Sequence, residues 1–404
     1  MVRTGHWGED YVCLALRMEK LFPGFVDGYF GPVEWKALVD AEPEQLAPDL
    51  LKQAAALADE LPAQGYEPRR AAYLQKQVGA MELLCRKLAG EKVSLADEVR
   101  LCFDIQPQWT PEAEFEEALA IYEDALPGEG NVQQRLGARR TRYELGREKA
   151  HLVKVLMERT MAEVRRRTLA FVDLPEGEGV SLRTVTDQPW GAYNWYHGNY
   201  QSLIEVNTDL PTNVGGLLEM MAHEGYPGHH TEHVLKEQLL YRGKGYVENS
   251  ILLINTPECV ISEGIATLAG EMIFGQSEAR TWLSDQLYPA AGIEAVYEDQ
   301  AKLNRAAELL AGVRGNAVFM LHAEGRPDDE VVRYLVRYGL MPEDRARKAM
   351  SFLKSPLWRA YTFTYFYGKR LMLPLLQGED RLQVFRRLLT EQVYPSLLLE
   401  WANP

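Results

Sequence analysis

The string HEGYPGHH, from His223 to His230, carries more information about fold and chemistry than any other stretch of the chain. It follows the apolar run LLEMMA at 217–222, which is typical of a buried helix. The chain has eight histidines, and four of them fall between residues 223 and 233: His223, His229, His230 and His233. Neutral imidazoles are the usual nitrogen ligands of zinc. A carboxylate beside the first histidine, here Glu224, can act as a general base. The cluster predicts a metal site rather than histidines that only complete hydrogen bonds in the core.

The spacing of these histidines differs from the usual zinc-binding helix, where the second ligand follows the first by four residues. Here that position is Pro227. On an unbroken helix the seventh residue returns to nearly the same face, which slightly favours His230, but seven residues rise about 10.5 Å. Pro227 and Gly228 therefore predict a break in the helix that could bring either His229 or His230 to the metal. If His230 is the ligand, His229 supports the site or contacts the substrate.

A third ligand is expected because catalytic zinc sites keep three protein ligands and one open position. Glu263 is the best candidate, since this acid lies in the small, apolar helix ISEGIATLAGE, which should be buried. A buried, unpaired carboxylate is unfavourable, and a metal ion removes the penalty. Glu271, two turns further on, either supports a metal-bound histidine or is a solvated helix acid.

The strings HEGYPGHHTEH and SEGIATLAGE resemble the HExxPGHH and EGxA motifs of a large bacterial family of unknown function that is grouped with the gluzincin metallopeptidases. The resemblance runs from about Trp190 to Gly368, and includes the strings VNT at 206–208 and YFYG at 365–368. It implies a zincin-like helical metallopeptidase architecture. It also implies zinc on His223, on His229 or His230, and on Glu263, with Glu224 as the base.

Periodicity predicts a mainly α fold with a small β-sheet. Apolar residues recur at helical spacing from about Tyr11 to Leu169, whereas aromatic and β-branched residues at 190–196 and 202–207 predict a small sheet or hairpin. Further helices are expected at 260–274, 299–325, 327–338, 342–353 and 356–376. We expect one two-lobed domain over 1–404, with a helical lobe at 1–180 and a zincin-like lobe at 181–404 that carries the metal.

Composition excludes some partners. The net charge of −14 argues against nucleic acid, whose binding depends on neutralising phosphates. The start of the chain lacks a signal-peptide pattern, and no apolar stretch approaches the ~20 residues of a membrane span. These features predict a cytoplasmic protein with no membrane partner. Cys13, Cys85, Cys102 and Cys259 lack metal or redox spacing and are expected to be buried thiols.

Several other residues are candidates for supporting roles. Tyr365 and Tyr367 follow the metal motif, and either could stabilise an oxyanion, with Tyr365 preferred. His322 lies in an apolar helix and could orient substrate or bond to a backbone carbonyl, and the second, core interpretation is favoured. His197 and Asn199 precede a strand at 203–207 that could pair with an extended peptide, although both also fit an ordinary turn.

These observations predict a zinc-dependent hydrolase, most simply a metallopeptidase that acts on peptides, with Glu224 as general base and Tyr365 as a catalytic candidate. Two alternatives remain open. The same chemistry could cleave a non-peptide amide or ester, or the chain could be a binding protein with a degenerate zincin site. The oligomeric state is not predicted.

Overall fold

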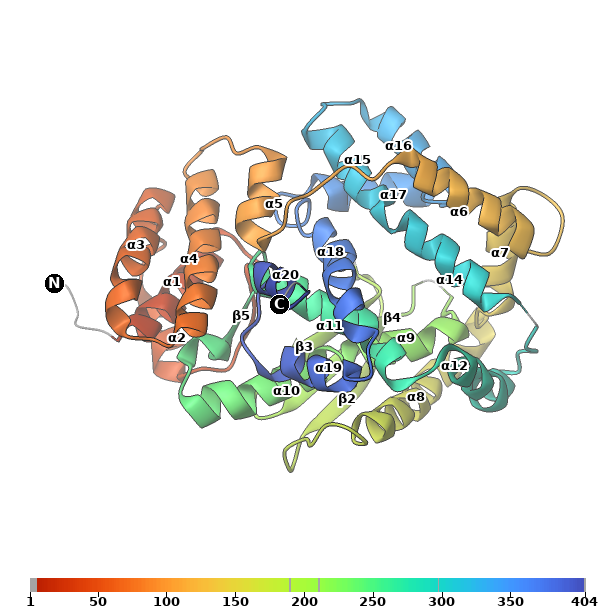
Figure 1. Cartoon of the computed structure of the whole chain (residues 1–404), viewed down its shortest axis with the longest axis horizontal. Coiled ribbons are helices and arrows are strands. Elements are labelled where there is room, and N and C mark those ends of the chain that lie inside the picture. The colour runs from red at the N-terminus through yellow and green to blue at the C-terminus, as the bar shows by residue number, and fades with distance from the viewer. Residues whose placement is uncertain (1–5, 189, 210, 297, 403–404) are drawn as a thin grey trace.

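The computed structural model describes residues 6–402 except 189, 210 and 297. It is mainly helical with two small sheets, which confirms the predicted fold class (Figure 1). None of the helices in this described part combines the length and apolar composition that a membrane crossing requires.

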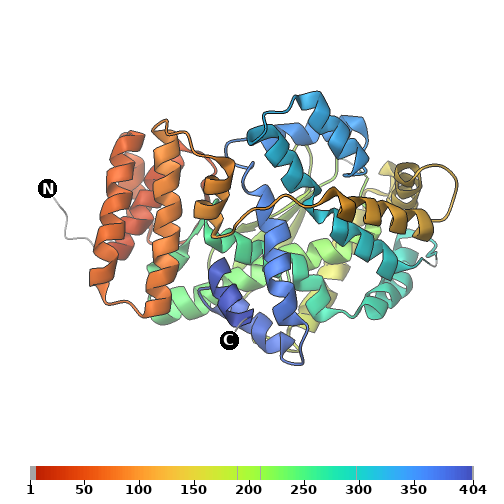
Figure 2. The same ribbon diagram turned by 45° about the horizontal axis from the view of Figure 1, so that its top comes forward.

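The first four helices gather at one end of the molecule in both ribbon views (Figures 1 and 2). They are α1 (Trp7–Leu21), α2 (Val33–Ala41), α3 (Ala47–Glu60) and α4 (Pro68–Leu88). Between α1 and α2, β1 (Val26–Tyr29) pairs antiparallel with β5 (Ile251–Leu253). This pairing ties the N-terminal segment to the chain that follows the histidine motif.

One large hydrophobic core joins the two halves of the sequence. It includes Trp7, Leu74 and Phe103 from the N-terminal half together with Val260 and Phe385 from the C-terminal half. The expected boundary near residue 180 therefore does not separate two cores.

The next helices along the chain are α5 (Leu95–Phe103), α6 (Glu112–Ala125), α7 (Val132–Arg142) and α8 (Leu152–Thr168). Of these, α6 packs along α14 (Gln300–Leu309), and α8 packs against the helix that leads into the histidine motif. The apolar residues of that second contact, Leu156, Met157, Leu218 and Met221, belong to a separate buried cluster.

A three-stranded sheet lies beside the histidine motif. Its strands are β2 (Gly179–Val185), β3 (Ala192–Tyr196) and β4 (Gln201–Asn207), in the order β2-β4-β3. Strands β3 and β4 are antiparallel, which confirms the predicted hairpin, whereas β2 runs parallel to β4. The turn between β3 and β4 holds Asn199 at φ 52, so the turn interpretation of this segment is confirmed.

The strand proposed from sequence to pair with a peptide is not at an edge. Strand β4 contains residues 203–207 and is hydrogen-bonded on both sides, by β2 and by β3. An extended peptide cannot add to a strand whose backbone groups are already paired. The edge strand of this sheet next to the histidine motif is β3.

The predicted break in the histidine helix is confirmed. Helix α9 (Leu217–Glu224) ends at the glutamate of the motif, and α10 (His229–Lys236) starts a new helix. Between them Gly228 packs so tightly that an added Cβ would lie 1.9 Å from the His223 carbonyl oxygen. A side chain at this position would clash with the backbone of α9, so glycine is needed for the chain to fold back there.

Helix α11 (Pro257–Ile273) follows, close to the predicted 260–274. The remaining helices are α12 (Gln276–Trp282), α13 (Tyr288–Ala291), α15 (Val313–His322), α16 (Asp328–Arg337), α17 (Glu343–Lys354), α18 (Thr362–Met372), α19 (Arg381–Thr390) and α20 (Pro395–Ala402). The single helix expected at 299–325 is two helices, α14 and α15. The helix expected from residue 356 starts six residues later, at Thr362.

Helices α11 and α18 lie in close contact at the centre of the molecule (Figure 1). The contact is made by two glycines: a Cβ added to Gly368 would lie 2.7 Å from the backbone nitrogen of Gly264. Because no side chain separates the two backbones, Tyr361 and Tyr365 at the start of α18 come within reach of Glu263 on α11.

Candidate metal centre

Three side-chain atoms from three consecutive helices converge on one point. His223 Nε2, at the end of α9, lies 3.5 Å from Glu263 Oε2 on α11. His229 Nε2, at the start of α10, lies 3.9 Å from the same oxygen. Two ligands of one tetrahedral zinc ion are separated by about 3.4 Å, given zinc bonds of about 2.1 Å. The spacing of these atoms therefore suits a single metal ion with small adjustments.

Glu263 carries an oxygen that nothing in the described chain satisfies. The residue is 4% exposed, and Tyr361 donates a hydrogen bond of 2.6 Å to Oε1. Oε2 is buried and has no hydrogen-bond partner among the described residues. Burial raises the pKa of this carboxyl to about 7, although the tyrosine hydroxyls act to lower it. A buried carboxylate oxygen without a donor is the kind of acceptor that a bound cation would satisfy.

A buried hydrogen-bond chain orients His229. Its Nδ1 lies 3.0 Å from Ser262 Oγ, and Ser262 donates in turn to Glu232 at 2.6 Å. Because the serine proton is committed to Glu232, the serine oxygen accepts from His229 Nδ1–H, and the lone pair of Nε2 faces Glu263. Lys236 donates to Glu232 and to Glu258, which compensates both carboxylates.

The histidines of this cluster are held neutral. Burial lowers the pKa of His223 to about 4, although a hydrogen bond to the backbone of Ala266 acts in the opposite direction. Burial also lowers the pKa of His229 well below its usual value, and the neighbouring His223 and His233 add to the effect. Neutral imidazole is the form that binds a metal ion, so the two rings already have the protonation state that ligation requires.

The structure does not bring His230 to this cluster. Its Nδ1 lies 2.8 Å from Ser202 Oγ and its Nε2 lies 3.0 Å from Glu178 Oε2. Both ring nitrogens are therefore engaged, and the side chain is fully buried. The sequence favoured His230 over His229 on the assumption that both lie on one continuous helix with His223. The chain instead turns at Gly228, and a second helix, α10, begins at His229. The helical spacing from His223 therefore does not decide which histidine joins the cluster.

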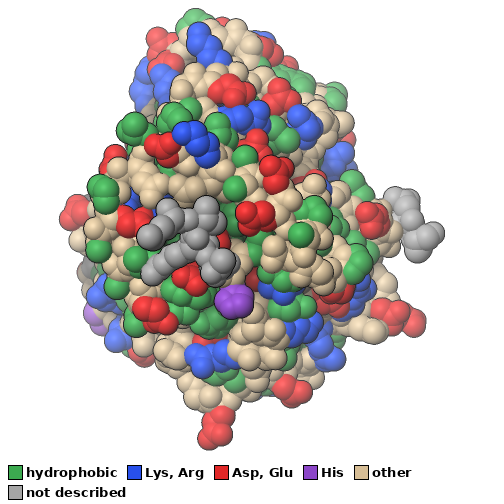
Figure 3. All heavy atoms as spheres, turned by 90° about the vertical axis from the view of Figure 1, so that its left-hand side faces the viewer, with side chains coloured by type: hydrophobic (Ala, Val, Ile, Leu, Met, Phe, Trp, Pro, Cys, Tyr) green, Lys and Arg blue, Asp and Glu red, His purple; other side chains and the backbone are tan. Residues whose placement is uncertain are grey.

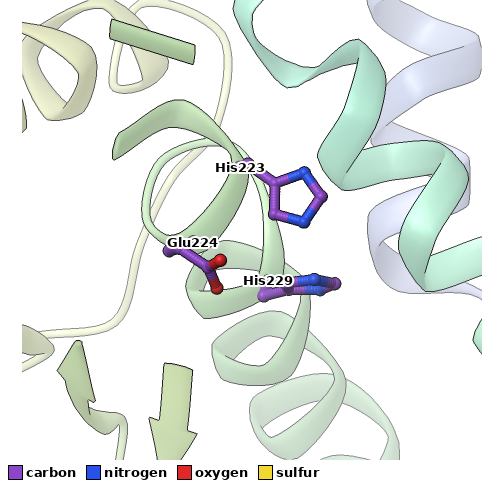
Figure 4. A group of neighbouring side chains, drawn as sticks. All are labelled: His223, Glu224 and His229. Atoms are coloured by element: carbon purple, nitrogen blue, oxygen red, sulfur yellow. The ribbon is translucent and has the colours of Figure 1, made fainter. Parts of the chain in front are cut away.

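Glu224 lies beside the two histidines with its carboxylate directed toward them (Figure 4). Its carboxylate and the ring nitrogens of His223 and His229 lie within 4.8 Å of one another. Burial raises the pKa of Glu224 to about 8, and the charge of Glu263 adds to this. Within the described residues no donor binds its carboxylate, whereas Asn194 holds its backbone carbonyl at 2.5 Å. The carboxylate of Glu263 is thus held by Tyr361, whereas the carboxylate of Glu224 has no donor among the described residues.

The cluster opens into a cavity of about 140 Å³. Part of its wall is apolar, with Leu252, Ile254 and Trp358, and part is polar. The polar part includes residues that sequence reasoning missed: Asp27 from β1, Tyr193 and Asn194 from β3, and Tyr361, which directly precedes α18. Nothing in the sequence around Asp27 indicated a site, because it comes from a strand almost two hundred residues before the motif.

The supporting candidates divide between the cavity and other places. Tyr365 lines the cavity, and its hydroxyl acts to lower the pKa of Glu263. Tyr367 lies elsewhere, where its hydroxyl accepts from the backbone nitrogen of Gln108 at 2.8 Å. His322 Nε2 bonds to the carbonyl of Leu353 at 2.8 Å, as the core interpretation predicted. Glu271 pairs with Lys369 at 2.7 Å near the surface. Of the two roles considered for Glu271, this position fits the solvated helix acid.

The four cysteines are buried free thiols, as predicted. On the face that carries the N-terminal helices, acidic and basic side chains are interspersed (Figure 3). The described residues of that face form no extended basic area of the kind that binds nucleic acid.

Comparison with known proteins shows the fold alone. No family model matches the chain, and no curated protein matches it either. The structure is similar to the crystal structure of "the putative lipoprotein from Colwellia psychrerythraea", with a TM-score of 0.55 and 16% sequence identity. The match covers 92% of this chain and 62% of that one, so the chain spans less than two thirds of that protein's length.

Proposed function

We propose that the protein is a zinc-dependent hydrolase that cleaves peptide bonds, with a zincin-like metal centre on His223, His229 and Glu263. The observation that carries the proposal is the buried, unpartnered Oε2 of Glu263 beside two neutral imidazoles. Two nitrogens and one carboxylate oxygen are the ligand set of many catalytic zinc sites. A zinc ion held there would supply the positive charge that activates water and polarises a carbonyl. The cytoplasmic location stays a prediction from the sequence.

Glu224 is the general base in this proposal. Its carboxylate faces the same cavity and is free of hydrogen-bond donors in the described chain, so it can take a proton from the attacking water. The same group then delivers the proton to the nitrogen of the leaving amine. Although burial raises its pKa to about 8, positive charge held between His223 and His229 favours the ionised form that a base needs.

Tyr365 is the donor we assign to the oxygen that becomes negative when the carbonyl is attacked. It lies in the wall of the cavity that also contains Glu224 and Glu263. A preorganised hydroxyl of this kind stabilises developing charge more than water does. Tyr361 is not assigned this role, because its hydroxyl donates a hydrogen bond to Oε1 of Glu263 and orients that carboxylate.

Hydrolysis of a substrate panel tests the proposal. The panel contains short unblocked peptides, simple esters and small non-peptide amides, and is assayed with chelator-treated protein before and after zinc is added back. We expect peptide cleavage that chelation abolishes and zinc restores. Cleavage confined to esters or non-peptide amides would support the alternative hydrolase. Stoichiometric zinc binding without turnover on any substrate would support a binding protein.

A matched pair of histidine variants separates the two neighbouring residues of the motif. His229→Gln should weaken zinc binding by at least about 100-fold, because a ligand is lost. His230→Gln should keep zinc affinity but lower the free energy of unfolding by about 1–3 kcal/mol, because Glu178 loses a buried partner. Zinc titration and denaturant unfolding measure the two effects. The reverse pattern would make His230 the ligand.

A further inference from the structure

Asp27 is a carboxylate in the cavity that the proposed mechanism does not use. It lies on β1 and lines the same wall as Glu224. The Tyr193 hydroxyl donates a hydrogen bond to its Oδ1. In the described part of the chain it has no Lys, Arg or His partner. Its charge acts on both Glu224 and Glu263, which places it close to the metal centre.

The other carboxylates around the cavity already have a compensating group. Lys236 pairs with Glu232 and Glu258 at 2.7 and 2.8 Å. Glu263 would bind the metal, and Glu224 would work as the base beside it. Asp27 is therefore left as a partly buried negative charge supported only by a neutral hydroxyl, and such a charge favours a bound cation.

Asn194 supplies a second, independent sign of a missing donor. It is 8% exposed and lies on edge strand β3, in the cavity wall. Its Nδ2 donates to the carbonyl of Glu224, but its Oδ1 is buried without any hydrogen-bond partner among the described residues. The polar wall thus presents a carboxylate that has no cationic partner and an amide oxygen that has no donor among the described residues.

A protonated amine carries both properties that these two acceptors require, since it is positive and donates up to three hydrogen bonds. No described Lys or Arg lines the cavity. The cavity is therefore poorly suited to the carboxylate at the other end of a peptide.

We propose that Asp27 and Asn194 bind the free amino terminus of a peptide substrate, so that the enzyme removes residues from that end. The inference rests on the proposed hydrolase function. The α-amino nitrogen lies only about 2.5 Å from the carbonyl carbon of its own residue, so a group that binds it must be near the metal, as Asp27 is. The cavity volume is close to the ~150 Å³ that holds one benzene ring, which leaves room for one terminal residue. The apolar wall of Leu252, Ile254 and Trp358 favours an apolar first side chain.

The probes are three forms of the tripeptide Leu-Ala-Ala: unblocked, N-acetylated and C-amidated. Binding is measured by calorimetry on zinc-loaded Glu224→Gln, which should not turn them over. Release of free leucine is measured with the wild-type protein. Acetylation should weaken binding at least about 10-fold and lower kcat/KM at least about 100-fold, because it removes the charge and leaves buried acceptors unpaired. Amidation should change either quantity less than about threefold, because the cavity wall offers the carboxylate no cation.

Asp27→Asn tests the residue itself. It should lower kcat/KM for the unblocked peptide at least about 10-fold, while zinc content stays unchanged. The difference in kcat/KM between the unblocked and acetylated peptides should therefore become smaller. Asp40→Asn is the matched control, because Asp40 is exposed on α2 and pairs with Lys36. Tyr193→Phe should act in the same direction with a smaller effect, since it removes the hydroxyl that orients Asp27. It replaces Asp27→Asn if that variant does not fold.

The outcomes separate this inference from the hydrolase proposal. Equal binding of the unblocked and acetylated peptides would overturn the inference, even if both are cleaved. Selective binding of the unblocked peptide without any hydrolysis would support amino-terminus recognition and count against the hydrolase. Release of leucine from the unblocked peptide alone would support both.

Discussion

Glu224→Gln is expected to lose hydrolytic activity by about 100- to 10,000-fold while it binds zinc as the wild-type protein does, which is the loss typical of removing a general base. The amide has nearly the same shape, so α9 and the bond from Asn194 to the carbonyl of residue 224 should persist. It cannot accept the proton of the attacking water. Steady-state kinetics on an unblocked peptide, with zinc content measured on the same sample, checks both parts.

Glu219→Gln is the matched control for this variant. Glu219 lies on the same helix, but it packs near Gly270 and is outside the cavity wall, so its replacement should leave turnover unchanged. Near-normal hydrolysis by Glu224→Gln with a full complement of zinc would show that another group takes the proton.

Glu263→Gln is expected to weaken zinc binding by at least about 100-fold, which exceeds the 10- to 100-fold typical of a residue that only orients a ligand. The amide oxygen can still accept the hydrogen bond from Tyr361, so the local fold should be kept. The position of Oε2 would then carry an NH₂ group, which has no lone pair available for a metal ion. Titration against a competing zinc chelator measures the change.

The control for this second variant is Glu271→Gln, which changes an acid two turns along α11 that pairs with Lys369. It should leave zinc affinity unchanged. Full affinity in Glu263→Gln would place the third ligand elsewhere, and Glu258, which lines the same cavity, would be tested next.

Local patterns were enough to predict the helical character of the N-terminal half, several helices of the C-terminal half and the β3–β4 hairpin. Proline and apolar spacing bounded α11 and α16 to within a few residues, because these signals act within a single helix. The pairing of β1 with β5 was missed, since it joins residues more than two hundred positions apart and each strand is short. The parallel pairing of β2 with β4 also depends on tertiary contacts that periodicity does not report.

The metal cluster was partly predictable for a chemical reason. His223, Glu224 and Glu263 could be proposed together from the sequence because imidazole and carboxylate side chains in buried segments are the groups that bind a cation, and the structure places them around one cavity. The choice between His229 and His230 was not predictable, because it depends on how far the chain turns at Gly228. That turn depends on the close contact between Gly228 and the backbone of α9. The spacing of residues along a regular helix does not predict such a contact.

The residues around the proposed ligands could not be found from the sequence alone. Ser262 orients His229, and Tyr361 orients Glu263, but each acts across a contact between two helices. The tyrosine comes close because Gly264 and Gly368 let α11 and α18 touch. Asp27 enters the cavity only through the β1–β5 pairing, so the N-terminal half contributes more to the site than its sequence suggested.

The most direct test of the metal centre is the zinc content of protein purified without chelator, measured by elemental analysis and repeated after stripping and reloading. The three converging atoms of His223, His229 and Glu263 predict one zinc ion per chain, lost on chelation and regained on addition of zinc. Less than about half a zinc ion per chain, with no uptake when zinc is supplied, would contradict a mechanism that needs one metal ion at each site.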